Sequence, residues 1–146
     1  MSFVFDDLAS KGVLWELLNE KLNLNSRKEL IQVCIQIERM QWQSLDLSVL
    51  VDRAAEQGDK YATEILQEAA QCTYRLAASI IDKLKLNEEP VFKVGAWGSA
   101  IAKSPLHFQF FKHNLEQNYP DVQVCIADID AGMGACRMAQ ALMLQK

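Results

Sequence analysis

The sequence has no long apolar run, no excess of positive charge and no closely spaced cysteines, and each absence excludes a class of protein. No apolar stretch approaches the ~20 residues that a membrane-spanning helix needs. Fifteen Lys and Arg stand against nineteen Asp and Glu, a net charge of −4, which argues against nucleic-acid binding by phosphate neutralisation. The opening residues, MSFVFDD, carry no basic segment of a secretory signal. We therefore expect a cytoplasmic protein that binds neither membranes nor nucleic acid.

Cysteine and histidine chemistry also has little support. The four cysteines are Cys34, Cys72, Cys125 and Cys136. They form no CxxC pair and stand among apolar neighbours, which is typical of reduced, buried thiols. The two histidines, His107 and His113, are six residues apart and so do not share a helix face. We expect no metal site, and we find no catalytic residue set.

The size and composition are those of one globular domain. Of 146 residues, 50% are apolar and 23% are charged. A fold of this size buries roughly 68–70% of the surface of its unfolded chain, enough for a core without disulfides or metals. We expect residues 1–146 to form a single unit. Its first part, 1–88, should be mainly helical, and 89–146 should follow the order strand, loop, helix, strand, helix.

The first part predicts four helices from apolar spacing and capping signals. An apolar stripe over 14–22 ends near Asn23, and Ser26 to Glu29 is typical of a capping box before a second helix. Asp46 can cap a third helix, for which Gly58 is a plausible stop.

The fourth helix, from Asp59 to about Lys85, is the clearest element. Its apolar residues follow a 3-4 spacing for some seven turns. We expect this stripe, Leu76 included, to be buried at the centre of the helical layer. A coiled-coil dimer is the alternative, which the many small alanines in the stripe disfavour.

The later part of the chain has an α/β pattern. A strand over 91–94 enters the loop 95–99, and Ser104 with Pro105 indicates a helix N-cap followed by proline at the first helical position. That helix runs to about Gln117, a second strand covers 122–126, and a last helix begins at 132. This order predicts parallel strands.

The loop from Gly95 to Ser104 is the best candidate for a ligand site. A strand that ends in glycines before a helix can leave backbone N–H groups free for a phosphate. A structural turn is the alternative, since neither GxGxxG nor GxxxxGK[ST] is present. Trp97 can stack on a base or cover the core edge, and Lys103 can face a phosphate or only solvent. The carboxylates of Asp128 and Asp130 fit helix capping better than acid–base catalysis.

Four stretches resemble one protein family. Residues 51–66 (VDRAAEQGDKYATEIL) look like its A-x-x-G-D-x-x-A-x-x-I-L pattern, and 94–106 are similar to its adenosine motif. Residues 132–139 look like its closing G-A-x-x-x-A helix, and 7–10 lie where it has D-E-G-S. The family is that of the N-acetylglucosamine kinases and BadF/BadG/BcrA/BcrD ATPases, two-lobed phosphotransferases. The resemblance covers nearly the whole chain but only the latter half of a family member.

The resemblance implies an α/β, ribonuclease H-like lobe of the actin/hexokinase type, helix-rich with a small sheet. It implies that Gly95, Ala96, Trp97 and Ser104 bear on the adenosine or near phosphates of ATP. The family's D-x-G-x-T loop, catalytic Asp and G-T-G-S loop are missing from this sequence. ATP with Mg²⁺ is therefore expected to act only in a complete two-lobed enzyme, with N-acetylglucosamine the preferred acceptor.

The partner implied by the resemblance is the missing N-terminal lobe. A different class of function stays open: a non-catalytic α/β module that pairs with another chain or with itself. In that case, the face that normally meets the other lobe should expose apolar surface.

Overall fold

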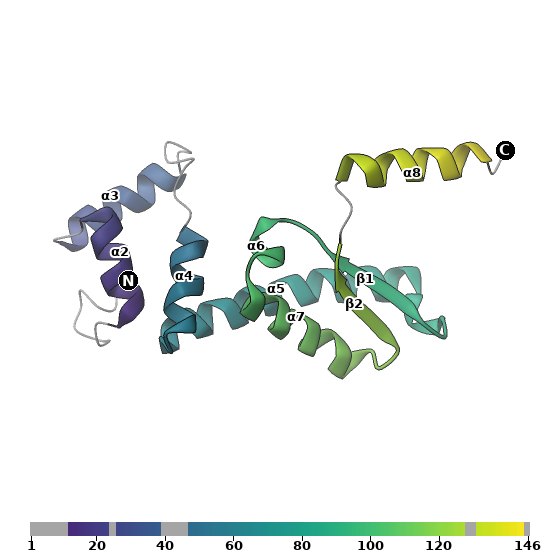
Figure 1. Cartoon of the computed structure of the whole chain (residues 1–146), viewed down its shortest axis with the longest axis horizontal. Helices are drawn as coiled ribbons and strands as arrows, with labels where there is room; N and C mark the ends of the chain where they lie inside the picture. The colour runs from purple at the N-terminus through teal and green to yellow at the C-terminus, as the bar shows by residue number, and fades with distance from the viewer. Residues whose placement is uncertain (1–11, 24–25, 39–46, 128–130, 145–146) are drawn as a thin grey trace.

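A computed structural model describes residues 12–23, 26–38, 47–127 and 131–144 (Figure 1). The resemblance at 7–10, the Asp46 cap and the carboxylates Asp128 and Asp130 lie outside these residues. The described elements are α2 (Val13–Leu22), α3 (Arg27–Glu38), α4 (Leu47–Glu56), α5 (Lys60–Leu84), η1 (Leu86–Glu88), β1 (Phe92–Ala96), α6 (Ser99–Ala102), α7 (Pro105–Asn118), β2 (Val122–Ile126) and α8 (Ala131–Leu144). The predicted helix-rich α/β class with a small sheet is confirmed.

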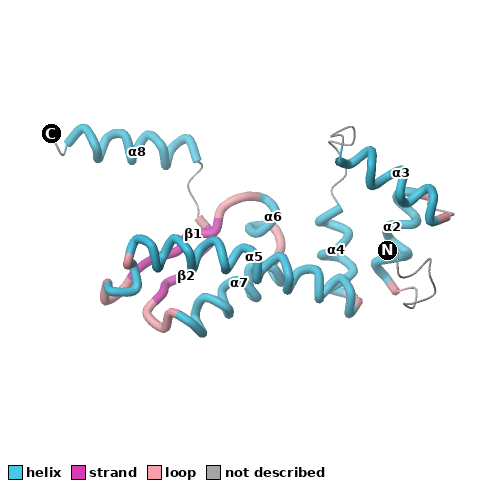
Figure 2. Tube along the Cα trace, turned by 180° about the vertical axis from the view of Figure 1, so that it is seen from behind, coloured by secondary structure: helices cyan, strands magenta, loops and turns pink. Residues whose placement is uncertain are grey.

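Within the described ranges the sheet has two strands, and they are parallel, as the strand–helix–strand order predicted. Phe92 of β1 is the Cα partner of Val122, and the register continues to Ala96 opposite Ile126. The crossover between the strands contains α6 and α7, and α7 lies beside α5 (Figure 2). Helices α5 and α7 therefore provide the packing surface for the strands.

Among the described residues, buried apolar side chains form two clusters. The sheet-side core consists of Ala70, Ile81, Phe92, Ala96, Ile101, Phe111, Leu115 and Val122. The helical core consists of Leu14, Leu18, Leu50, Ala54, Ala55, Ala62 and Leu66. Because α5 contributes its first two turns to the helical core and its later turns to the sheet-side core, it connects the two.

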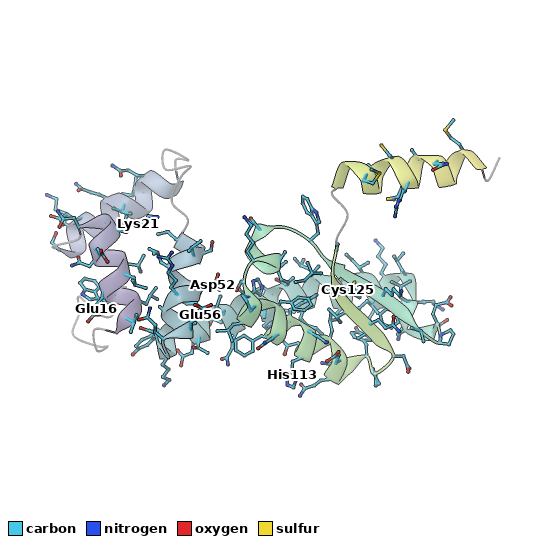
Figure 3. All side chains as sticks on the ribbon, viewed as in Figure 1. Glu16, Lys21, Asp52, Glu56, His113 and Cys125 are labelled. Atoms are coloured by element: carbon cyan, nitrogen blue, oxygen red, sulfur yellow. The ribbon has the colours of Figure 1, made fainter. Side chains whose placement is uncertain are left out.

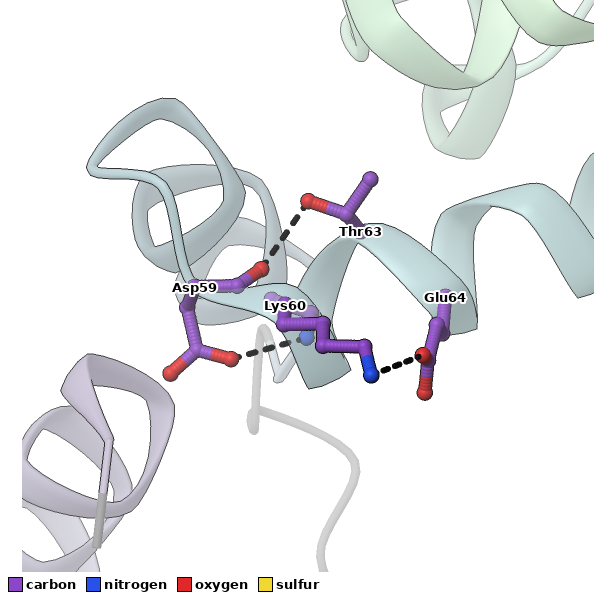
Figure 4. A network of polar contacts seen from close by, with 5 residues as sticks. Asp59, Lys60, Thr63 and Glu64 are labelled. Carbon is purple, nitrogen blue, oxygen red and sulfur yellow. Dashed lines mark hydrogen bonds and ion pairs between the residues drawn. The ribbon is translucent and has the colours of Figure 1, made fainter. Parts of the chain in front are cut away.

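The corner between α4 and α5 explains the A-x-x-G-D-x-x-A pattern in structural terms. Gly58 has φ +82°, a conformation that favours glycine, and its N–H donates to the Ala55 carbonyl at 3.0 Å. The Asp59 carboxylate then caps α5 by accepting from Ala62 N–H at 3.0 Å (Figure 4). Ala62 is completely buried, so a larger side chain would not fit. The motif therefore specifies a helix corner.

Asp59 also joins the start of α2 to this corner. Its second carboxylate oxygen accepts from Leu14 N–H at 2.8 Å, and the residue is 6% exposed. A Cβ atom added at Gly12 would collide with that same oxygen. One buried carboxylate thus caps two helices, and its bond to Leu14 joins residues 45 positions apart in sequence.

The predicted burial of the α5 stripe is wrong for one of its sides. The helix is confirmed, and Asp59 proves to be its N-cap; Leu66, Ala70 and Ile81 are buried. Leu76, however, is 70% exposed, and Ile80 and Leu84 are more than half exposed. The physical reason is the width of the sheet: two strands cover only one side of a 25-residue helix.

The predicted burial of the cysteines is also wrong where the structure describes their side chains. Cys72, Cys125 and Cys136 are exposed free thiols, while the side chain of Cys34 lies outside the described part. Cys125 is in β2, where successive side chains point to opposite faces. Its apolar neighbour Val124 packs against the core, so Cys125 faces outward (Figure 3). Apolar neighbours in a strand therefore do not predict burial of the residue between them.

Candidate functional site

An apolar groove opens beside the carboxyl end of β1, where the sequence placed its candidate site. Its volume is about 390 Å³, and β1, the following loop and one side of α5 line it. Gly95, Ala96 and Trp97 are all in this lining, together with Leu76 and Ile80 of α5. Three of the four predicted site residues are thus brought together.

Gly95 and Ala96 are the last two residues of β1, whereas the sequence pattern assigned them to the loop. A Cβ atom built on Gly95 would approach the Ala127 Cβ at 3.6 Å, an ordinary van der Waals contact. The fold therefore does not require glycine at this position. Gly95 is the Cα partner of Cys125, so a side chain here would point to the same outward face of the sheet.

Trp97 is 59% exposed, so it does not cover the core edge. It follows β1 directly and precedes Gly98, which has φ +108°. The short helix α6 begins at Ser99, and no pattern in the sequence indicated it. An exposed indole over an apolar groove can stack on a flat ring, which is the role that the sequence left open.

Ser104, the fourth predicted residue, is not in the groove lining. It is 2% exposed and its hydroxyl accepts from His107 N–H at 3.3 Å, which confirms the predicted N-cap of α7 with Pro105 at the first position. The same hydroxyl donates a hydrogen bond to the carboxylate of Asp52 on α4, a residue labelled in Figure 3. The bond from His107 N–H caps α7, and the bond to Asp52 holds the start of α7 against α4.

His107 supports the same junction, a role that its position in the sequence did not indicate. It is 8% exposed, and its Nδ1 lies 3.1 Å from the Ala100 carbonyl of α6. Because a carbonyl can only accept, Nδ1 donates here. Its Nε2 lies 3.4 Å from the Thr73 hydroxyl on α5. A buried histidine on the first turn of α7 thus connects α5, α6 and α7 and supports the base of the loop.

At the other end of the sheet, Tyr119 has a perturbed pKa. Its hydroxyl donates to an Asp82 carboxylate oxygen at 2.9 Å. Burial, followed by the hydrogen bond and the negative charge of Asp82, raises the pKa of Tyr119 to about 12. Its ring also meets Phe92 edge-on, with the centroids 6.2 Å apart. This group fastens the end of α5 to the start of β2 and has no place in the groove.

The groove is chemically suited to an aromatic ring and unsuited to a metal ion. The described residues that line it include Thr73 and Lys93 as polar groups but no carboxylate. Mg²⁺ prefers carboxylate and phosphate oxygens, so these residues do not fit a magnesium site. Within the described ranges, no three His, Cys, Asp or Glu residues come together to hold a metal. No described helix is both long and apolar enough to cross a bilayer.

Comparison with known proteins adds one relative. The chain is 30% identical over 135 residues to the N-acetyl-D-glucosamine kinase of Dictyostelium discoideum. The match covers 92% of this chain but 42% of the kinase, so the chain spans less than half the length of the curated relative it matches. No family model matches the sequence. No solved structure matches it either.

Proposed function

We propose that this chain is the adenosine-side, C-terminal lobe of an ATP-dependent sugar kinase of the actin/hexokinase type, with N-acetylglucosamine as the preferred acceptor. The main support for this proposal is the groove at the carboxyl end of β1, which Gly95, Ala96 and Trp97 line together. The similarity to an N-acetyl-D-glucosamine kinase supports this assignment, because nearly the whole chain aligns with only part of the enzyme. Membership of the wider BadF/BadG group and a cytoplasmic location stay predictions.

The proposed role of the groove is to bind and orient the base of the nucleotide. The Trp97 indole stacks on adenine, and the apolar side chains of Leu76 and Ile80 exclude water from the other side of the ring. Gly95 lies two residues before Trp97, so its lack of a side chain leaves room for the ligand beside the indole. When bound with ATP, Mg²⁺ supplies charge neutralisation at the phosphates, and the other lobe must provide its carboxylate ligands.

In this proposal, Ser104 acts on the loop and not on the ligand. Its bonds to Asp52 and to His107 N–H hold the N-terminus of α7 in place. The loop between β1 and α7 is then anchored at both ends, since Ala96 belongs to the sheet-side core. An anchored loop presents Trp97 with little loss of conformational entropy on binding.

Nucleotide titration of the isolated chain by calorimetry tests the proposal. One lobe supplies only part of the enclosure, so ATP or ADP should bind no tighter than high micromolar, about −5 kcal/mol. Trp97→Ala and Gly95→Val should both abolish the measurable heat. Tyr61→Ala removes an aromatic ring that is 43% exposed on α5 and outside the groove lining, so it serves as the matched control. Binding that is indifferent to both groove variants would overturn the placement of the site.

A second candidate function is a non-catalytic interaction module. The observation in its favour is the exposed apolar side of α5, where Leu76, Ile80 and Leu84 are each more than half exposed. Apolar surface of this kind marks an interaction face. Absence of any nucleotide binding together with stable association of the chain would favour this function over the first.

A further inference from the structure

The backbone of strand β1 has an open edge that faces the groove. β2 pairs with one side of β1, and among the described strands none pairs with the other. Residues 93–96 of β1 line the groove together with Trp97, whereas no residue of β2 belongs to the lining. The groove therefore runs along the side of β1 that has no partner strand.

One hydrogen bond fixes the direction of the backbone groups in β1. Ala127 N–H donates to the Ala96 carbonyl at 2.8 Å, so the backbone groups of Ala96 point toward β2. The backbone groups of successive residues in a strand point to opposite sides. The carbonyl of Lys93 and the N–H of Gly95 therefore both point to the open edge. They stand on either side of Val94 and offer the groove a hydrogen-bond acceptor next to a donor.

Apolar side chains lie above and below the plane in which this edge continues. Ala96 belongs to the sheet-side core, on the face of the sheet that α5 covers. Leu76 and Ile80 of α5 line the groove from that face. Trp97 is the next residue after Ala96, and side chains alternate along a strand, so its indole lies toward the opposite face. A flat ring at the open edge is therefore enclosed between the indole and α5.

We propose that the open edge of β1 recognises the hydrogen-bonding edge of adenine and sets the nucleotide preference of the groove, an inference that rests on the proposed function. The exocyclic amino group of adenine donates to the Lys93 carbonyl, and the ring nitrogen beside it accepts from Gly95 N–H. Adenine carries this amino donor next to a ring-nitrogen acceptor, which is the complement of what the strand edge offers. Recognition uses the backbone of both residues and does not require the Lys93 ammonium group.

The same edge disfavours a purine that carries an oxo group. Hypoxanthine has a carbonyl oxygen where adenine has its amino group. That oxygen would face the Lys93 carbonyl, and two acceptors cannot form a hydrogen bond. A bidentate contact to a base discriminates strongly against the wrong base. We therefore expect ATP to bind on the order of tenfold more tightly than inosine triphosphate (ITP).

Nuclear magnetic resonance of the isolated chain, labelled with ¹⁵N-glycine, is the first test. The sequence has six glycines, and the Gly95 signal is identified by its loss in Gly95→Ala. Saturating ATP should move the Gly95 amide proton downfield, whereas ITP at the same concentration should not. Gly58 already donates to the Ala55 carbonyl at 3.0 Å and is outside the groove lining, so its signal is the internal control. ATP that shifts other glycine signals but not that of Gly95 would overturn the proposal.

Gly95→Pro tests the donor directly, because it removes the N–H group. Proline is tolerated on an edge strand when its missing N–H would face away from the partner strand, and far-UV circular dichroism verifies the fold. The ratio of the ITP and ATP dissociation constants should fall toward one in this variant. The ATP and ITP titrations of the native chain test the proposal without it.

Gly95→Ala is the matched comparison, because it keeps the N–H group. A Cβ atom built at this position meets the Ala127 Cβ at 3.6 Å, an ordinary contact. The added methyl group should weaken both nucleotides by a similar factor and leave their ratio unchanged. The same ratio in Gly95→Pro and Gly95→Ala would contradict recognition through the N–H.

The outcomes separate this inference from the proposed function. A chain that gives neither heat nor shifted signals with any nucleotide would refute both. ATP binding that depends on Trp97 but is no tighter than ITP binding would overturn the recognition by β1 alone, because the groove would then bind a purine without distinguishing its edge.

Discussion

At the scale of single residues, the most consequential side chains are polar, buried and fully hydrogen-bonded. Asp59 caps α5 and α2 with separate oxygens, and Ser104 connects the start of α7 to α4. A buried polar group without a partner costs free energy, so each of these bonds specifies one relative placement of two helices. Motif residues that resemble those of a kinase thus have a structural role that does not depend on catalysis.

Ser104→Ala should lower the free energy of unfolding by about 0.5–2 kcal/mol, because it removes the N-cap of α7. It also leaves the Asp52 carboxylate without the hydroxyl that donates to it. Urea denaturation followed by circular dichroism measures the loss. Ser99→Ala is the control, since Ser99 is exposed and no side-chain cap bond forms at the start of α6. An unchanged midpoint for Ser104→Ala would mean that α7 does not depend on this cap.

Tyr119 should make stability fall at high pH. Its pKa in the folded state is about 12, above the ordinary tyrosine pKa of about 10 that holds in the unfolded chain. Its contribution is therefore fully present below about pH 10 and is lost as the pH rises toward 12. Urea midpoints at pH 9 and 10.5 should fall more for the native chain than for Tyr119→Phe, which has no proton to lose. A parallel decrease in both proteins would contradict the assignment.

At the scale of elements, α5 has two apolar sides, of which one is buried and the other is exposed. One side enters both cores, through residues such as Leu66 and Ile81. The other side, with Leu76 and Ile80, lines the groove and is exposed. The 3-4 spacing of apolar residues predicts the helix but not which apolar side is buried, because the residues of both sides follow the helical period.

Paired alanine substitutions in α5 should separate its two sides. Ile81→Ala should cost about 2–5 kcal/mol, because Ile81 is 2% exposed and its removal leaves a cavity. Leu76→Ala should stay within about 0.5 kcal/mol of the native chain, because Leu76 is exposed. Denaturant unfolding of both variants provides the comparison. A large loss of stability for Leu76→Ala would contradict the exposure of this side of α5.

At the scale of the whole molecule, the described residues provide only part of what phosphoryl transfer requires. Its groove can hold a ring, but the described residues that line it include no carboxylate for a metal ion or a proton. Phosphoryl transfer requires positioned phosphates, metal ligands and a group that orients the nucleophile. The chain aligns with less than half of a sugar kinase, which agrees with a site whose metal ligands come from another part of the enzyme.

The isolated chain should therefore give no turnover of ATP with N-acetylglucosamine. A coupled assay of ADP release measures this, and a complete N-acetylglucosamine kinase run beside it verifies the detection. Robust turnover by the purified 146-residue chain, abolished by Trp97→Ala, would refute the half-enzyme proposal. It would also require a catalytic residue set elsewhere in the chain.

Local chemistry in the sequence was enough to predict most of the elements and their ends. The helical period of α5, the Ser104 cap and the Gly58 stop depend on residues at most four positions apart, so they can be predicted from the sequence alone. The parallel strands followed from the strand–helix–strand order. Gly95, Ala96 and Trp97 were predicted as a group because they are consecutive.

Only the tertiary structure decided which side of each element is buried. Leu76 is exposed because the sheet beside it ends at β1, and the width of a sheet depends on pairings between distant segments. Ser104 is inside because Asp52, from another helix, reaches its hydroxyl, and Cys125 is outside because nothing in the described chain covers that face of β2. Burial is a property of what lies opposite a side chain, and long-range contacts of this kind leave no periodic signal in a single sequence.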